Sequence, residues 1–105
     1  MGQNLKKTTQ SNHPEDNNTY KVRALTYVYL SAWASKLMKF SEAETQQFAQ
    51  EIVSLSVSTP EIIFEHIKNI LQKHSISVDL DQLQKQFEDY QRLARIQVMD
   101  LNRAP

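Results

Sequence analysis

The sequence predicts an all-α fold, a four-helix bundle with a disordered N-terminal arm, on three observations. Apolar residues recur at helical spacing in four segments. Helix-start patterns precede these segments. Residues 75–78 alternate serine with apolar side chains, but no second strand is available to pair with them, so we expect an extended connector there. Because 105 residues make at most one domain, we expect a flexible arm over residues 1–19 and a single four-helix domain over residues 20–105.

The arm and the first helix differ sharply in composition. Residues 1–19 hold only two apolar side chains, too few to offset the entropy lost on ordering. A helix is predicted from Tyr20 to Lys39, capped by Asn18 or Thr19. Its apolar stripe is wide, which favours contact with two other helices rather than one. The stripe comprises Val22, Leu25, Tyr29, Ala32, Trp33, Leu37 and Phe40, with Val28, Leu30 and Met38 beside it.

The second and third helices have clear start signals. Ser41, followed three residues later by Glu44, matches a capping box, and this helix should end near Ser56. Pro60 suits the first turn of the third helix, which should end near His74. The side chains expected to be buried are Phe48, Ile52 and Leu55 in the second helix and Ile63, Phe64, Ile67, Ile70 and Leu71 in the third.

The fourth helix is predicted to be the longest. Asp79 is expected to cap it, with Gln82 three residues later, and the helical pattern continues to about Asn102. Its buried stripe is expected to contain Leu83, Phe87, Tyr90, Ala94, Val98 and Leu101.

Composition excludes several classes of function. The absence of cysteine rules out a disulfide scaffold and thiolate chemistry, and a net charge of zero argues against a nucleic-acid binder. Gly2 is the single glycine, so no phosphate-cradling loop can form. The longest uncharged helical stretch is shorter than the about 20 residues that a membrane span needs. The first ten residues also lack the apolar core of a secretory signal, which indicates a cytoplasmic protein.

No catalytic, cofactor or metal site is expected. His66 and His74 lie about two helical turns apart, too far to share a metal ion. The serines lie outside any strained glycine elbow, and neighbouring carboxylates such as Glu88 and Asp89 point to different helix faces. We therefore expect a protein that is not an enzyme.

The zero net charge conceals an uneven distribution. Residues 1–40 carry six basic and two acidic side chains, whereas residues 41–66 carry five acids and no base. Residues 67–105 are nearly balanced, with six bases and five acids. One interpretation is ordinary salt bridging and solubility; the other is a polarised surface that orients a partner.

One stretch resembles a known family. Residues 32–53, AWASKLMKFSEAETQQFAQEIV, resemble part of the zeta subunit of bacterial F-type ATP synthases. Residues 20–24 are similar to that family's Phe-Lys-x-Arg-Ala segment, and residues 63–90 continue in register through its third and fourth helices. The resemblance covers about residues 20–95. The matching positions in the central stretch are Trp33, Ala34, Lys36, Leu37, Phe48, Ala49, Ile52 and Val53.

The resemblance implies a four-helix regulatory protein that binds the catalytic head of the F-type ATP synthase. Family members block ATP hydrolysis chiefly through an N-terminal segment that inserts between catalytic and rotor subunits. We therefore expect a protein that is monomeric when free and lies at the membrane periphery only through the synthase. No nucleic acid, cofactor or direct membrane insertion is expected. The residues expected to contact the partner are Leu5, Lys6, Lys7, Tyr20, Lys21 and Arg23.

An alternative follows from departures within the N-terminal part. Residues 1–10 lack the phenylalanines and acids typical of the family's inhibitory segment, and residues 25–28 replace the basic cluster that usually follows the Arg-Ala pair. These departures favour a divergent helical protein-interaction module of the same fold without inhibitory activity.

Overall fold

The structure is all-α, as predicted. A computed structural model describes the backbone of residues 14–103, with side chains described over residues 18–100. Four helices make up this part of the chain, and it contains no strand. Their bounds are α2 (Pro14–Leu37), α3 (Glu42–Ser54), α4 (Pro60–Lys73) and α5 (Leu80–Arg103). None of these helices combines the length and apolarity needed to cross a membrane.

Helix α2 begins six residues before the predicted start at Tyr20. Pro14 occupies its first position, where the missing N–H costs nothing. Asn18 and Thr19 therefore lie inside the helix and do not cap it. Residues 14–19, assigned above to the arm, are helical backbone. Residues 1–13, the rest of that arm, lie outside the described residues.

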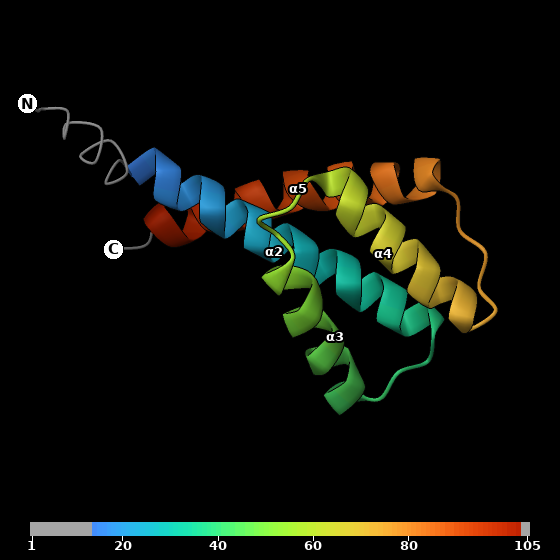
Figure 1. The fold of residues 1–105 in the computed structure, drawn as a ribbon. Helices are drawn as coiled ribbons and strands as arrows, with labels where there is room; N and C mark the ends of the chain where they lie inside the picture. Colours follow the sequence, from blue (N-terminus) through green and yellow to red (C-terminus); the bar gives the residue numbers. More distant parts are fainter. Residues whose placement is uncertain (1–13, 104–105) are drawn as a thin grey trace, which may run out of the picture.

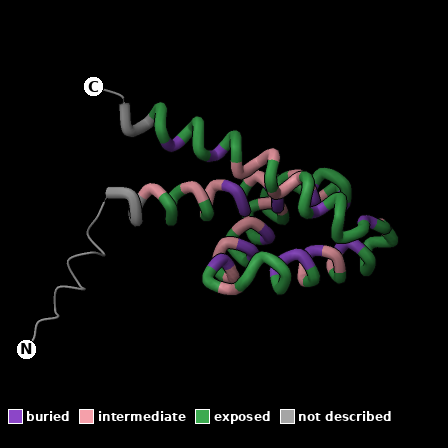
Figure 2. Tube along the Cα trace, turned by 90° about the horizontal axis from the view of Figure 1, so that it is seen from above, coloured by how far each residue is buried: buried purple, intermediate pink, exposed green. Residues whose placement is uncertain are grey.

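The two long helices, α2 and α5, run antiparallel, and α3 and α4 cover one end of this pair (Figure 1). Helix α2 contacts α3, α4 and α5, which confirms that its wide stripe serves more than one neighbour. Figure 2 shows α2 and α5 separating toward the two termini. The buried cluster draws on all four helices and on the connector before α5; its members are Tyr27, Leu30, Ala34, Met38, Phe48, Ile52, Ile63, Phe64, Ile67, Leu71, Val78 and Leu83.

The predicted stripes of α3, α4 and α5 are confirmed in most positions, whereas the stripe on α2 was misplaced. Leu101 of the predicted α5 stripe lies outside the residues whose side chains are described. The predicted positions that are buried are Phe48, Ile52, Ile63, Phe64, Ile67, Leu71, Leu83, Ala94 and Val98, and those partly buried are Leu55, Ile70, Phe87 and Tyr90. Ala32 is exposed and Leu37 is 40% exposed, whereas Leu30, Ala34 and Met38 are buried. Apolar residues surround much of α2, so their periodicity could not single out the inward face. Trp33 and Phe40 pack against the cluster from its edge.

The buried face of α2 also carries small hydroxyl side chains. Thr26, Ser31 and Ser35 are almost completely inaccessible to solvent. The Thr26 hydroxyl donates to the carbonyl of Val22 at 2.6 Å, and that of Ser31 donates to the carbonyl of Val28 at 2.9 Å. The Ser35 hydroxyl has no hydrogen-bond partner among the described residues. Small side chains here let neighbouring helices approach α2 closely.

Helices α2 and α4 end in the same way. Lys39 and Ser75 adopt positive φ angles of 59° and 63°. After each helix, two backbone N–H groups turn back to its last carbonyls: Lys39 to Lys36 and Phe40 to Ser35, then Ser75 to Gln72 and Ile76 to Leu71. This is the Schellman motif, in which the chain reverses direction and the residue after the left-handed position packs back against the last turn of the helix. Phe40 and Ile76 consequently pack on the buried cluster.

The predicted N-terminal signals are confirmed for α3, α4 and α5. The Ser41 hydroxyl accepts from the N–H of Glu44 while the Glu44 carboxylate accepts from the N–H of Ser41, a complete capping box. Pro60 begins α4. The Asp79 carboxylate accepts from the N–H of Gln82 at 2.8 Å, at the start of α5. Local sequence therefore fixes where these three helices begin.

Replacing Ser35 with alanine should stabilise the fold by about 1 kcal/mol, because a buried hydroxyl without a partner retains its desolvation penalty. Ser31→Ala is the matched control, since it removes a hydroxyl that is hydrogen bonded. Chemical denaturation followed by circular dichroism measures both. If Ser35→Ala lowers the free energy of unfolding as much as Ser31→Ala does, the Ser35 hydroxyl does have a hydrogen-bond partner and the prediction is wrong.

Lys39→Gly should raise the free energy of unfolding by up to about 1 kcal/mol, because a Cβ atom disfavours the left-handed conformation. Lys36→Gly, three residues earlier and inside α2, should lower it by about 0.5–1 kcal/mol. The opposite signs of the two changes, measured by thermal unfolding, test the cap. Equal destabilisation by both would rule out the left-handed conformation at Lys39.

Candidate functional site

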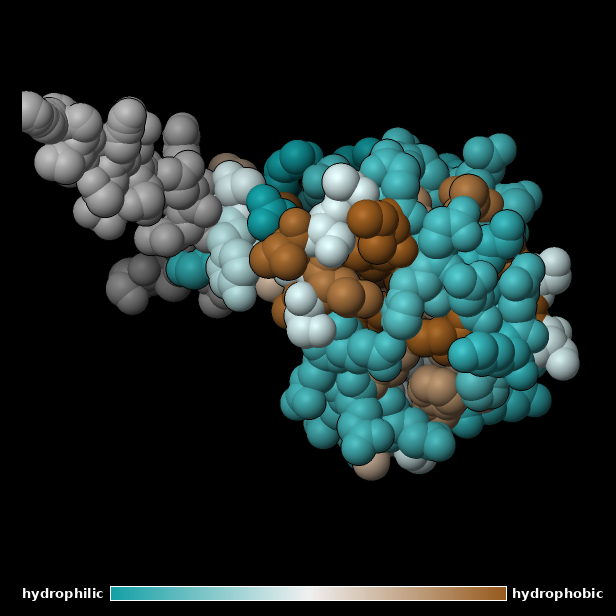
Figure 3. All heavy atoms as spheres, in the orientation of Figure 1, coloured by the Kyte–Doolittle hydropathy of each residue, from teal (hydrophilic) through white to brown (hydrophobic). Residues whose placement is uncertain are grey.

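A groove of about 950 Å³ lies where α2, α5 and the loop between α3 and α4 meet. It occupies the part of the helix pair that α3 and α4 leave uncovered. Figure 3 shows apolar side chains gathered on this face of the molecule, next to the end that carries the termini. The lining comprises Asn18, Thr19, Val22, Arg23 and Tyr27 of α2, Ser56, Val57, Ser58 and Pro60 at the loop, and Phe87, Gln91, Arg95, Val98 and Met99 of α5.

Helical spacing explains why these residues share one groove. On α2, Thr19, Arg23 and Tyr27 are four residues apart, and on α5, Phe87, Gln91 and Arg95 are likewise four apart. Residues at this spacing lie on one helix face. The rings of Tyr27 and Phe87 meet with their centroids 5.5 Å apart, which closes the inner end of the groove. In antiparallel helices, Arg23 then lies level with Gln91, and Arg95 lies one turn farther out.

The third wall of the groove is the loop that follows α3. Its backbone is folded by hydrogen bonds from the N–H of Ser56 to the carbonyl of Val53 at 2.9 Å and from Ser58 to Leu55 at 2.8 Å. The Ser56 side chain is buried, whereas Val57 is 87% exposed. The loop thus presents an apolar side chain at the rim of the groove.

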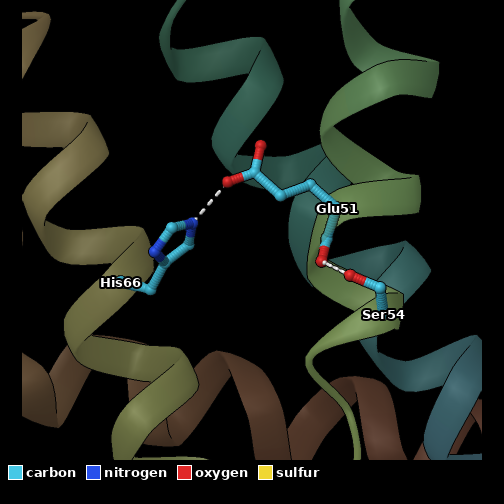
Figure 4. Close-up of polar contacts among 3 residues, drawn as sticks. All are labelled: Glu51, Ser54 and His66. Atoms are coloured by element: carbon cyan, nitrogen blue, oxygen red, sulfur yellow. Dashed lines mark hydrogen bonds and ion pairs between the residues drawn. The ribbon is translucent and has the colours of Figure 1, made fainter.

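A polar contact ties the two helices that flank this loop. His66 of α4 and Glu51 of α3 approach to 2.6 Å between Nε2 and Oε2 (Figure 4). The Ser54 hydroxyl donates to the backbone carbonyl of Glu51 at 2.7 Å. Both members of the pair are partly exposed, so the contact contributes less than about 1 kcal/mol. It links α3 to α4 close to the loop. Sequence spacing alone did not reveal it.

The charge of the groove is positive. Among the residues whose side chains the structure describes, Arg23 and Arg95 are the charged ones that line it, and that lining includes no carboxylate. Within the described part of the chain, the ion pairs join His66 to Glu51 and Arg92 to Asp89, so neither lining arginine is paired. Guanidinium groups favour carboxylate and phosphate partners in bidentate geometry. The groove therefore suits a ligand that is both apolar and anionic.

Burial raises the pKa of the Tyr27 phenol above its ordinary value of 10.0. The Arg23 guanidinium opposes this shift, and Glu61 adds to it. Tyr27 is 1% exposed, so desolvation of its phenolate dominates. The phenol therefore stays protonated at neutral pH, and Tyr27 adds no charge to the inner end of the groove.

The structure brings one of the expected partner-binding residues, Arg23, to the groove. Tyr20 and Lys21 are exposed on the same helix, where the groove lining does not include them. Leu5, Lys6 and Lys7 lie outside the described residues. Sequence reasoning missed Arg95, although its spacing of eight residues from Phe87 offered a signal, because nothing in the sequence indicated which α2 face it would meet.

The described residues contain no group of three or more His, Asp or Glu side chains that could hold a metal ion. His74 does not approach His66; its Nδ1 lies 3.1 Å from the carbonyl oxygen of Ile70, and its ring packs against Phe40. The histidines between residues 14 and 103 therefore make structural contacts.

The raised pKa of Tyr27 predicts a loss of stability as the pH rises above 10.0, the ordinary value. The tyrosine of the unfolded chain releases its proton first, so the unfolded state binds fewer protons and becomes favoured. Tyr27→Phe should flatten this dependence, whereas Tyr20→Phe, at a side chain 58% exposed, should leave it unchanged. Urea denaturation between neutral and alkaline pH measures it. If the free energy of unfolding depends on pH in the same way in the wild-type chain and in Tyr27→Phe, the raised pKa of Tyr27 is wrong.

Comparison with known proteins adds one finding. The family profile described as ATPase inhibitor subunit zeta matches residues 6–97. This range includes α2, α3, α4 and most of α5, together with part of the chain before α2. Comparisons with curated proteins and with solved structures found no significant match.

Proposed function

The chain belongs to the ATPase inhibitor subunit zeta family, and from this membership we propose that it binds the catalytic head of an F-type ATP synthase and restrains ATP hydrolysis there. The profile match carries the proposal, because it spans the helical domain and extends upstream to residue 6. The family description fits a regulatory subunit, and a groove lies between α2, α5 and the α3–α4 loop.

The inhibitory mechanism that we propose is steric. The N-terminal part of the chain enters the cleft between catalytic and rotor subunits, and the helical domain anchors it. Helix α2 supports such a role because it is continuous from Pro14 into the buried cluster at Leu30 and Ala34. Helix α2 also contacts the three other helices, so a force applied at its N-terminus is transmitted to all of them. Rotation is resisted by an obstruction, and the chain takes no chemical part in hydrolysis.

The proposal also defines where the protein works. Bound to the synthase head, it lies at the membrane periphery on the cytoplasmic side and does not enter the bilayer. When free it is a monomer. The family membership supports the location at the synthase.

A second candidate function is a binding module that docks on its partner without inhibiting it. The observation in its favour is the composition of residues 1–10, which contain no phenylalanine and no acid. In this version the helical domain keeps its docking surface while the upstream segment no longer obstructs rotation.

Full-length protein should lower the rate of ATP hydrolysis by the cognate synthase head about tenfold at saturation, whereas a chain lacking residues 1–13 should bind without inhibiting. The matched control is a chain in which residues 1–13 are scrambled, which preserves length, composition and charge. A coupled spectrophotometric assay measures hydrolysis, and sedimentation measures binding.

The outcomes separate the two candidates. Binding of the full chain with an unchanged hydrolysis rate would overturn inhibition and establish the binding module. No binding at tens of micromolar would overturn both. Restored inhibition after residues 1–13 are replaced by a Phe- and acid-rich arm would show that the domain retains the docking surface.

A further inference from the structure

We propose that the groove between α2, α5 and the α3–α4 loop receives an amphipathic helix of the synthase head, one that presents two carboxylates about one helical turn apart. This inference rests on the proposed function and specifies the surface by which the domain docks. It assigns to Arg95 and Met99 a role that neither the family match nor the sequence pattern gives them.

The first argument is the uncovered apolar surface. Helices α3 and α4 cover one end of the α2–α5 pair, and the other end has no such layer among the described residues (Figures 1 and 3). At the groove, Val57 is 87% exposed and Met99 is 54% exposed. Val98 is nearly buried beside them and Val22 is half-buried. Exposed apolar side chains gathered around a concave surface are typical of an interaction site.

The second argument is the shape of the groove. Two diverging helices form its sides, and the rings of Tyr27 and Phe87 close its inner end. From Phe87 to Met99 the wall formed by α5 is about 18 Å long, at 1.5 Å per residue. A helix of about three turns matches this length and would bury an apolar stripe at helical spacing. Such a helix would supply a layer that residues 14–103 do not themselves provide at this end.

The third argument is charge. Arg23 and Arg95 are exposed, come from opposite walls and have no carboxylate partner within the described residues. The register of the helices places Arg95 one turn farther out than Arg23. Carboxylates at positions i and i+4 of the bound helix lie on one face and have the same stagger. Among the described residues no acid lines the groove, and the nearest carboxylate that acts on it is that of Glu61, at the Tyr27 end and away from Arg95.

The test compares charge reversal inside and outside the groove. Arg23→Glu/Arg95→Glu should weaken binding to the isolated catalytic head about tenfold or more, because two attractive pairs become repulsive. Arg92→Glu is the control, since Arg92 lies on the same helix, is 67% exposed in its side chain and pairs with Asp89 outside the groove. Met99→Asp should weaken binding without altering either arginine. Biolayer interferometry at several salt concentrations measures the dissociation constants.

Further controls exclude loss of folding. The conservative variant Arg23→Lys/Arg95→Lys should keep most of the affinity, and circular dichroism should show unchanged helix content in every variant. Binding that weakens as salt increases in the wild-type chain, but much less in the Arg23→Glu/Arg95→Glu variant, supports the proposal because exposed charge pairs are screened.

Distinct outcomes overturn distinct statements. If the wild-type chain binds the head and the groove variants bind as tightly as Arg92→Glu, the groove proposal is wrong and the proposed function stands. If the wild-type chain does not bind, the proposed function fails and the groove proposal falls with it. If sedimentation shows a dimer that Arg23→Glu/Arg95→Glu abolishes while head binding is unchanged, the occupant is a second copy and the proposal is overturned.

Discussion

Close packing along the inward face of α2 is the constraint on which the rest of the structure depends. Leu30, Ala34 and Met38 are buried on this helix, and Ser31 and Ser35 lie among them. Larger side chains at the two serines would hold the neighbouring helices away, and the buried cluster would lose its contacts. The Ser35 hydroxyl is buried without a hydrogen-bond partner among the described residues, so the small size of this side chain, and not its polarity, suits the position.

The same packing explains why a groove forms at one end. The two Schellman caps turn the chain back after α2 and after α4, and they direct Phe40 and Ile76 onto the cluster. The 13 residues of α3 and 14 of α4 cannot cover the 24 residues of α2 and of α5 along their whole length. Toward the termini, beyond the contact between Tyr27 and Phe87, the main buried cluster has ended and α3 and α4 no longer cover the pair, although Ala94 and Val98 remain buried there.

This division between a closed and an open end suits a protein that binds another. The closed end supplies stability through complete burial of aliphatic side chains such as Ile52, Ile63 and Ile67. The open end keeps apolar side chains exposed, together with Arg23 and Arg95, which have no ion-pair partner within the described part of the chain; exposed apolar surface of this kind contributes nothing to the stability of the isolated chain. Burial of Met99 and Val57 against a partner would recover the transfer free energy that the free protein forgoes.

Local sequence by itself determined the number of helices, the starts of α3, α4 and α5, and the buried faces of those three helices. Capping groups such as Ser41 and Asp79 act within one turn, so their effect can be read without knowing the fold. Resemblance to the zeta family also came from sequence, and the profile match confirms it. Only the tertiary structure decided which face of α2 is buried. It also decided that Arg23 and Arg95 lie on opposite walls of one groove. Apolar residues lie on most sides of α2, and which of them is buried depends on where α3, α4 and α5 pack.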